Sequence, residues 1–286
     1  MATRRRVDGP PSSRRPPPRR RRRSGSDLGR RILWAVPLIA FAVFIVVEGG
    51  LIFTLGVLVV GILCMGELFE MLGSVRPVKL AGFLGVIALA FAALYGTTYN
   101  VLLMVVALLP VLFFLTIGRP RRDDRTLSMA VTVLAVWWIG LAIAHAVLLR
   151  RLPHGDAIIV DILVGTFLGD TAAYVGGRAF GRRPLAPEIS PNKTLEGLLI
   201  GMVFAVAGVW FAGLYQDWLS GVDAVLVGVA VAFAAPVGDL FESLIKRDVG
   251  AKDTGSVLGP HGGMLDRIDA VLFTIPVGYY VWHALM

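Results

Sequence analysis

Long uncharged apolar segments are the feature that most constrains how this chain can fold. Of its 286 residues, 56% are hydrophobic and 17% are charged, whereas soluble domains average about 45–50% apolar and roughly 25% charged residues. The excess lies in uncharged blocks of about 16–20 residues, long enough to approach or cross a hydrocarbon layer about 30 Å thick. A soluble helical bundle needs a polar face on most helices, and these blocks lack one. We therefore predict an all-α, polytopic integral membrane protein.

These blocks predict about nine transmembrane helices, of which the first two are separated only by residues 48–50. If the N-terminus is cytosolic, every Lys and Arg except Arg150 and Arg151 falls on the cytosolic side, as the positive-inside rule requires. The C-terminus is then external, and the polar segments 178–194 and 242–269 face the cytosol together. The approximate ranges of the helices are 32–49, 50–71, 79–96, 101–118, 129–149, 157–177, 195–215, 222–241 and 270–286.

Polar composition divides the chain into three regions. Residues 1–31 are rich in Arg and Pro and have almost no apolar side chains, so we predict a disordered, cytosolic, basic tail. It either attracts anionic lipid, contacts nucleic acid, or only anchors the topology, and the last interpretation is favoured. Residues 32–156 hold transmembrane helices with few polar groups, and residues 157–286 hold nearly all the intramembrane acids.

The eighth predicted helix ends in a group of polar residues. Pro236 interrupts the helix ladder and favours a kink, and Asp239 follows directly. On a helix, Asp239, Ser243 and the pair Lys246 and Arg247 share one face. An ionisable residue at the end of a span is a functional candidate, although headgroups could also solvate Asp239 at the interface.

The next loop contains acidic and basic residues together with several glycines. The glycines let the backbone turn tightly. Asp266 and Asp269 are spaced i, i+3 and share a face if the last helix begins there. Hard cations such as Mg²⁺ prefer carboxylates together with substrate phosphates, and neighbouring Lys and Arg suit phosphate oxygens. The cluster predicts a metal-bound polyphosphate site, while His261 could also serve only as a hydrogen-bonding residue of the turn. Its members are Lys252, Asp253, His261, Asp266, Arg267 and Asp269.

A second polar group surrounds the end of the sixth predicted helix. Asp170 lies well inside an apolar run. In the following loop, Ser190 and Pro191 are typical of a helix N-cap and first helical position. Lys193 would then lie in a first turn, where free backbone amides favour an anion; the alternative is a solvated Lys at an ordinary helix start.

Residues 243–269, with the sequence SLIKRDVGAKDTGSVLGPHGGMLDRID, resemble the signature of the phosphatidate cytidylyltransferase (CDP-diacylglycerol synthase) family. Segments 169–181 and 190–197 also resemble parts of that family, whereas the first five helices match only as hydrophobic spans. One departure is Gly259-Pro260, where the family has Pro-Gly before the His. The matching residues are Ser243, Lys246, Arg247, Lys252, Asp253, His261, Gly262, Gly263, Asp266, Arg267 and Asp269.

The resemblance implies that the region 157–286 is catalytic and converts CTP and phosphatidate to CDP-diacylglycerol and pyrophosphate with Mg²⁺, with a second cation left open. It implies metal binding by Asp239, Asp266 and Asp269. The residues assigned to catalysis are Lys252, Asp253, His261 and Arg267. Those assigned to substrate binding are Asp170, Ser190, Lys193, Ser243, Lys246 and Arg247.

Two other functions remain open from the sequence. A CTP-dependent lipid kinase would transfer the γ-phosphoryl group and release CDP instead of pyrophosphate. An ion-coupled transporter would use Asp170 and Asp239 to carry ions, but it leaves the loop signature unexplained. We expect an inner-membrane protein that binds CTP from the cytosol and phosphatidate from the bilayer, needs no nucleic acid, and is a candidate homodimer.

Overall fold

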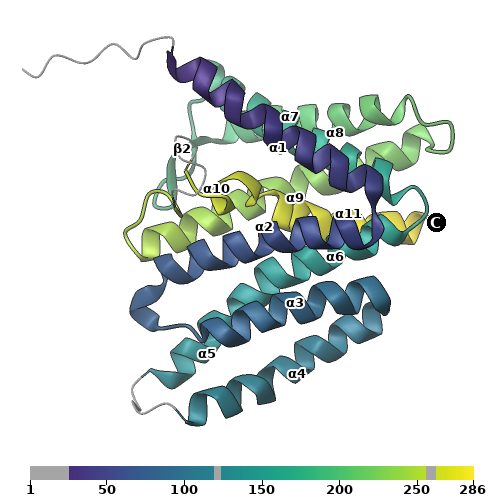
Figure 1. The fold of residues 1–286 in the computed structure, drawn as a ribbon. Helices are drawn as coiled ribbons and strands as arrows, with labels where there is room; N and C mark the ends of the chain where they lie inside the picture. The colour runs from purple at the N-terminus through teal and green to yellow at the C-terminus, as the bar shows by residue number, and fades with distance from the viewer. Residues whose placement is uncertain (1–25, 119–123, 256–261) are drawn as a thin grey trace, which may run out of the picture.

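The computed structural model describes residues 26–118, 124–255 and 262–286, and it is a bundle of roughly antiparallel helices (Figure 1). Helix α5 continues into α6 through a π-helical turn, Val136–Gly140. The helices are α1 (Ser26–Glu48), α2 (Gly50–Met71), α3 (Lys79–Tyr95), α4 (Thr98–Ile117), α5 (Arg125–Ala135), α6 (Leu141–Arg151), α7 (Gly155–Phe180), α8 (Leu195–Gly213), α9 (Gly221–Asp248), α10 (Leu265–Ile268) and α11 (Val271–Leu285), with a short 3₁₀ turn at Gly73–Val75.

Seven helical segments of the described chain are long and apolar enough to cross a membrane. Two further apolar helices are shorter, namely Val36–Glu48 within α1 and Lys79–Tyr95. The predicted count of nine depends on these two and stays a prediction. Helix α1 begins at Ser26, inside the range predicted as tail; the rest of that predicted tail, residues 1–25, lies outside the described residues.

A small antiparallel hairpin departs from the all-α prediction. Strands β1 (Pro184–Ala186) and β2 (Ser190–Thr194) pair with Pro184 opposite Thr194 and Ala186 opposite Ser190. The predicted helix start at Ser190 is therefore wrong. Thr194 is the N-cap of α8, and its hydroxyl accepts a hydrogen bond from the Gly197 N–H at 3.2 Å. Thr serves as a cap much as Ser does, and Pro191 is tolerated because the two-stranded sheet consists of edge strands.

Helices α7 and α8 pack closely because small residues face each other across their contact. A Cβ atom at Gly197 would lie 2.7 Å from the Ala173 carbonyl oxygen, and one at Gly201 would lie 2.8 Å from the Gly169 carbonyl oxygen. Such small residues let helix backbones approach closely in membranes. The pair α7–α8 thereby holds Asp170 and the hairpin in a fixed relation.

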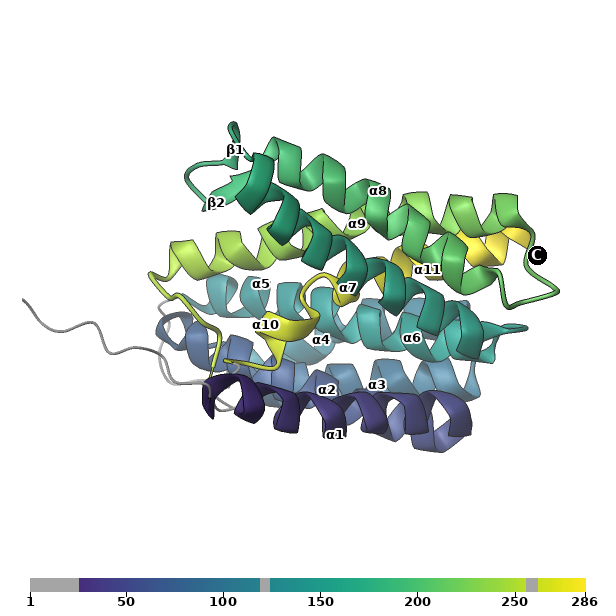
Figure 2. The same cartoon turned by 90° about the horizontal axis from the view of Figure 1, so that it is seen from above.

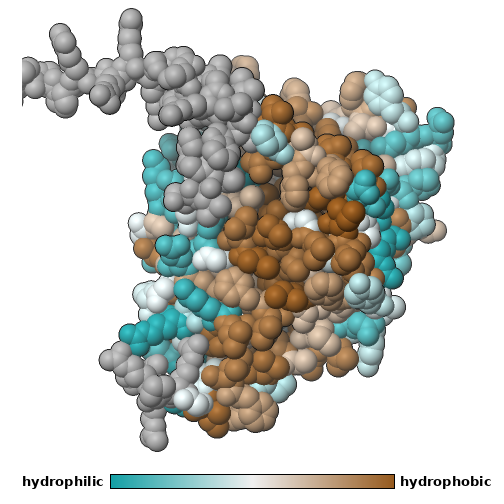
Figure 3. Space-filling view, in the orientation of Figure 1, coloured by the Kyte–Doolittle hydropathy of each residue, from teal (hydrophilic) through white to brown (hydrophobic). Residues whose placement is uncertain are grey.

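On the face shown in Figure 3, polar residues gather at the two ends of the bundle and apolar residues cover its middle. The hairpin and the C-terminal end of α9 lie at one end of the bundle, and the C-terminus lies at the other (Figures 1 and 2). At the C-terminal end, Arg150 donates to the Val46 carbonyl of α1 at 2.7 Å, and Arg151 donates to the Gly96 carbonyl after α3 at 2.6 Å. Carbonyls at helix ends lack partners within the helix. These two arginines therefore supply hydrogen-bond donors to the carbonyls at the ends of α1 and α3.

Candidate active site

Three carboxylates converge where α9 meets the start of α11. Asp239 and Glu242 lie one turn apart on α9, and Asp269 lies between α10 and α11; one oxygen from each lies within 4.8 Å of the others. A Cβ atom at Gly238 would lie 2.6 Å from the Asp269 carbonyl oxygen. The glycine therefore permits the close backbone approach that brings Asp239 to Asp269.

The donor set of this carboxylate triad fits a hard divalent cation. Glu242 is 1% exposed, and its buried Oε1 atom has no hydrogen-bond partner within the described part of the chain. A buried oxygen left without a donor is costly, whereas a cation such as Mg²⁺ prefers carboxylate oxygens. Glu242 was not among the residues predicted from the sequence, although it follows Asp239 at the i+3 position of the same helix.

Asp266 lies outside this triad, which differs from its predicted place in the metal site. Its carboxylate accepts hydrogen bonds from the Thr254 N–H at 3.0 Å and the Gly263 N–H at 2.9 Å, and from Lys246 Nζ at 3.0 Å. The prediction placed both acids on one face if the last helix begins there, but in the structure the Asp266 carboxylate is held by these loop and Lys246 donors instead of facing the triad. Asp266 therefore orders the loop, and Glu242 is the third carboxylate of the triad; a ligand role for Asp266 stays a prediction.

Lys246 connects the triad to this loop. Its ammonium group donates to Glu242 Oε2 at 2.5 Å as well as to Asp266. Its side chain is 15% exposed, and that of Glu242 is 2% exposed. A shielded cation between two carboxylates fixes both acids and partly offsets the negative charge of the site.

A polar pocket of about 660 Å³ opens beside the triad and shares Asp239 with it. Walls from α7, the hairpin, α8 and α9 surround it, and Lys193 of β2 forms an ion pair with Asp239. Other charged and polar residues on its walls are Asp170, Tyr174, Arg178, Ser190, Asn192 and Thr194. The structure therefore brings Asp170, Ser190, Lys193 and Asp239 together, although they come from three separate segments.

Other predicted site residues lie away from this pocket. Arg247 donates to the Ile189 carbonyl at 3.0 Å and so ties the hairpin to α9. Lys252, Asp253 and Arg267 are exposed and Ser243 is half-buried, and none of these four is among the described residues that line the pocket. His261 lies outside the described residues.

Glu67 of α2 holds the segment between α9 and α10, which lies within residues 243–269 and which we call the signature loop. Helix α2 belongs to the half of the bundle formed by α1–α6. Glu67 is 4% exposed and accepts hydrogen bonds from the N–H groups of Met264 and Leu265, both at 2.9 Å, and from the Thr254 hydroxyl at 3.4 Å. A Cβ atom at Gly263 would lie 2.6 Å from Glu67 Oε2. Glu67 was not among the residues predicted from the sequence, although an acid inside a predicted span is itself a signal of function.

Residues 29–285 match the model of the Cytidylyltransferase family, so the chain belongs to that family. The phosphatidate cytidylyltransferase of Bacillus subtilis (strain 168) is 32% identical over 264 residues, which cover 89% of this chain and 97% of the relative. The phosphatidate cytidylyltransferase of Thermotoga maritima is 31% identical over 249 residues, covering 78% and 92%. The uncharacterized protein YnbB of Escherichia coli (strain K12) is 39% identical over 158 residues, about half of each chain (52% and 53%). The resemblance inferred from residues 243–269 is confirmed.

Proposed function

We propose that this chain is a phosphatidate cytidylyltransferase, which converts CTP and phosphatidate to CDP-diacylglycerol and pyrophosphate in phospholipid biosynthesis. Family membership and the named relatives support the activity. One observation supports placing this activity at the site: Asp239 belongs both to the carboxylate triad and to the polar pocket, where it pairs with Lys193. A cation site and an anion-binding pocket are thus adjacent inside a membrane-spanning bundle, where a lipid phosphate and a nucleotide triphosphate can meet.

The reaction joins two anions, so alignment and charge neutralisation are the main tasks of the protein. A phosphate oxygen of phosphatidate attacks the α-phosphorus of CTP, and the bond from that phosphorus to the bridging oxygen of pyrophosphate breaks. A phosphate monoester has a second pKa of about 6 and is largely ionised near neutral pH, so no strong base is needed. Lys193 and Arg178 on the pocket wall supply positive charge for these phosphates.

Mg²⁺ is the proposed cofactor, held by Asp239, Glu242 and Asp269. A bound divalent ion would neutralise charge on the transferring group and orient the phosphates. Lys246 keeps Glu242 directed toward the site, and Asp266 keeps the loop in place through Thr254 and Gly263. The proposed triad leaves Asp266 out, so the predicted ligand role of Asp266 is a competing alternative that locating the bound cation would decide. A second cation and direct roles for Ser243, Arg247, Lys252, Asp253, His261 and Arg267 stay predictions.

Product analysis with labelled CTP tests the proposal. Purified protein with phosphatidate and Mg²⁺ should move label from the α-phosphate of CTP into lipid and release label from the γ-phosphate as pyrophosphate. A lipid kinase would instead put the γ-label into lipid and leave CDP. If neither label reaches lipid while the protein passes ions across vesicles without CTP, the transporter alternative holds and the proposal is wrong.

We further propose a multi-pass inner-membrane location with the hairpin end in the cytosol, because CTP is cytosolic and the basic hairpin region and the basic last turn of α9 lie at that end (Figure 1). Exposed Glu188 in the hairpin and exposed Asp217 before α9 form a matched pair for labelling. In a Cys64→Ala background, an impermeant thiol reagent should label Asp217→Cys in intact cells and should not label Glu188→Cys. The reverse pattern would invert the topology. Homodimer formation stays a prediction.

A further inference from the structure

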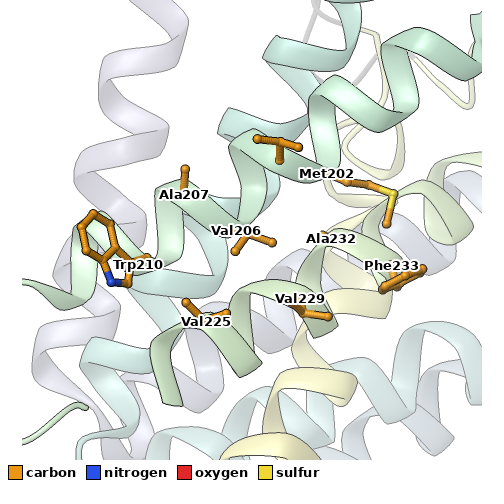
Figure 4. Close-up of a pocket in the computed structure, with 9 residues that line it drawn as sticks. Met202, Val206, Ala207, Trp210, Val225, Val229, Ala232 and Phe233 are labelled. Carbon is orange, nitrogen blue, oxygen red and sulfur yellow. The ribbon is translucent and has the colours of Figure 1, made fainter. Parts of the chain in front are cut away.

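An apolar groove of about 470 Å³ follows the seam between α8 and α9 (Figure 4). Five of its wall residues come from α8 and four from α9, and all are apolar or aromatic. Trp210 stands at one end of the groove, and Met202 and Phe233 stand at the other (Figure 4). Aromatic side chains therefore stand at both ends of the groove, Trp210 at one and Phe233 at the other (Figure 4).

The groove continues the polar pocket along the same two helices. On α8, Leu198 lines the pocket, and Met202, Val206 and Trp210 line the groove at successive steps of four residues. On α9, the pocket residue Pro236 is followed toward the groove by Ala232 and Val229. Residues three or four apart share one helix face, so each helix presents one uninterrupted face to both spaces.

The end of the groove near Met202 is therefore the end nearest to the triad. Asp239 lies one turn from Pro236 on α9 and forms its ion pair with Lys193 in the pocket. From Met202 to Trp210 the groove extends about 12 Å along α8, at about 1.5 Å per helical residue. Charge and polarity lie at one end of this path, and only apolar surface lies at the other.

We propose that the groove holds one acyl chain of the lipid substrate while the lipid phosphate lies in the polar pocket, and that Trp210 marks the far end of the chain site. The inference rests on the proposed function, because that function supplies a ligand with a phosphate and acyl chains. A bilayer is as apolar as the groove, so the groove gains little from hydrophobicity alone and selects by shape and packing. It therefore acts on chain length more than on overall affinity.

Paired variants test this specificity role. Ala207 lines the groove and is exposed, so Ala207→Phe should obstruct it; Ala40→Phe places the same side chain on the exposed surface of α1. Trp210→Ala should lengthen the groove, and Phe211→Ala removes the neighbouring ring, which does not line it. The measurement is kcat/KM for dioleoyl phosphatidate divided by kcat/KM for dioctanoyl phosphatidate, at equal surface concentration in mixed micelles.

We expect Ala207→Phe to lower this ratio about fivefold, because a long acyl chain then packs against less of the groove wall. Trp210→Ala should raise the ratio by a similar factor, because the lengthened groove accommodates more of a long chain. Ala40→Phe and Phe211→Ala should leave it within about twofold of the wild-type ratio. Val229→Phe on the facing helix obstructs the same groove, so a folding failure of Ala207→Phe leaves the test intact.

Three results would overturn the inference. An unchanged ratio in the folded groove variants, with normal pyrophosphate release by the wild type, would reject the acyl site and leave the proposed function standing. An unchanged ratio with an altered oligomeric state would make the groove an interface between copies of the chain. No pyrophosphate release by the wild type with either lipid would reject the proposed function, and this inference with it.

Discussion

Two buried glutamates, one in each half of the bundle, show how differently the halves use polar groups. Glu67, in the half formed by α1–α6, is 4% exposed and uses both carboxylate oxygens to accept hydrogen bonds from the signature loop. Glu242, in the half formed by α7–α11, is 1% exposed and keeps Oε1 without a partner among the described residues. A fully bonded acid is suited to hold structure, and an incompletely bonded acid is suited to receive a ligand. We therefore propose that the first half supports the site and that the second half carries the chemistry.

The largest effect should come from Glu242→Gln, which keeps the shape of the side chain but removes its charge from the triad. Loss of one ligand next to the reacting phosphates should lower kcat about 100- to 1,000-fold. The control is Asp248→Asn, which makes a similar change at an exposed position near the end of the same helix. Wild-type kcat in a folded Glu242→Gln protein would remove Glu242 from the site.

Glu67→Gln should have the next largest effect, although Glu67 lies in the supporting half. The amide offers one acceptor oxygen instead of two, so the N–H of Met264 or Leu265 loses its partner. Residues that orient ligating groups typically cost 10- to 100-fold when changed, and we expect a loss of about 10-fold in kcat.

Two further measurements separate positioning from folding at Glu67. The Mg²⁺ concentration for half-maximal activity should rise for Glu67→Gln, and Glu67→Asp should restore part of kcat. The matched control is Glu70→Gln, one turn later on α2 and exposed, which should change neither quantity. A variant that only melts earlier, with unchanged kcat and Mg²⁺ dependence, would make Glu67 purely structural.

The contrast between the halves was only partly visible in the sequence. Apolar block length predicted the membrane helices, and Asp170 and Asp239 were selected because charges inside or beside apolar runs are costly. Lys193 was selected because it was expected in the first turn of a helix, where free amides favour an anion. Glu67 lies 197 positions before Met264 in the chain, and spacing rules describe neighbours along one helix, so no local pattern connects the two. Glu242 was not predicted, because it lies one position before residues 243–269, which carried the family resemblance.

The hairpin was missed for a different physical reason. The segment 190–194 has a Ser and a Pro in the order typical of a helix start. Whether it instead forms a strand depends on pairing with Pro184–Ala186, and the propensities of its own residues do not determine that pairing. The difference affects the predicted chemistry, because strand β2, and not the first turn of a helix, positions Lys193 next to Asp239.

Replacing one glycine by alanine in each half compares how tightly the two halves are packed. The expected effect is smaller than that of either glutamate substitution. Gly238→Ala would place Cβ 2.6 Å from the Asp269 carbonyl oxygen, whereas Cβ at Gly66 on α2 meets nothing within 4 Å. We expect Gly238→Ala to destabilise the protein by about 1–3 kcal/mol and to lower activity. Gly66→Ala should be neutral or stabilising by up to about 1 kcal/mol. Thermal unfolding in detergent measures both, and equal melting temperatures would contradict the close contact of α9 with Asp269.

The smallest effect should follow removal of residues 1–25, which leaves α1 from Ser26 onward. Their Arg residues should act through electrostatic attraction to anionic lipid, which salt weakens. Specific activity in neutral detergent should stay within about twofold of the full chain, and the response to anionic lipid should weaken. Loss of CTP affinity in detergent, in protein of confirmed fold, would place the tail in the active site.

The central claim is that Asp239, Glu242 and Asp269, without Asp266, form the cation site of the second half. Anomalous scattering from Mn²⁺ in crystals of the full-length protein tests it directly, since Mn²⁺ prefers the same oxygen ligands as Mg²⁺. The account predicts a peak between these three carboxylates in the wild type and its loss in Glu242→Gln, with Asp266 still bonded to Lys246. A peak that includes Asp266 as a ligand, and that persists in Glu242→Gln, would contradict it.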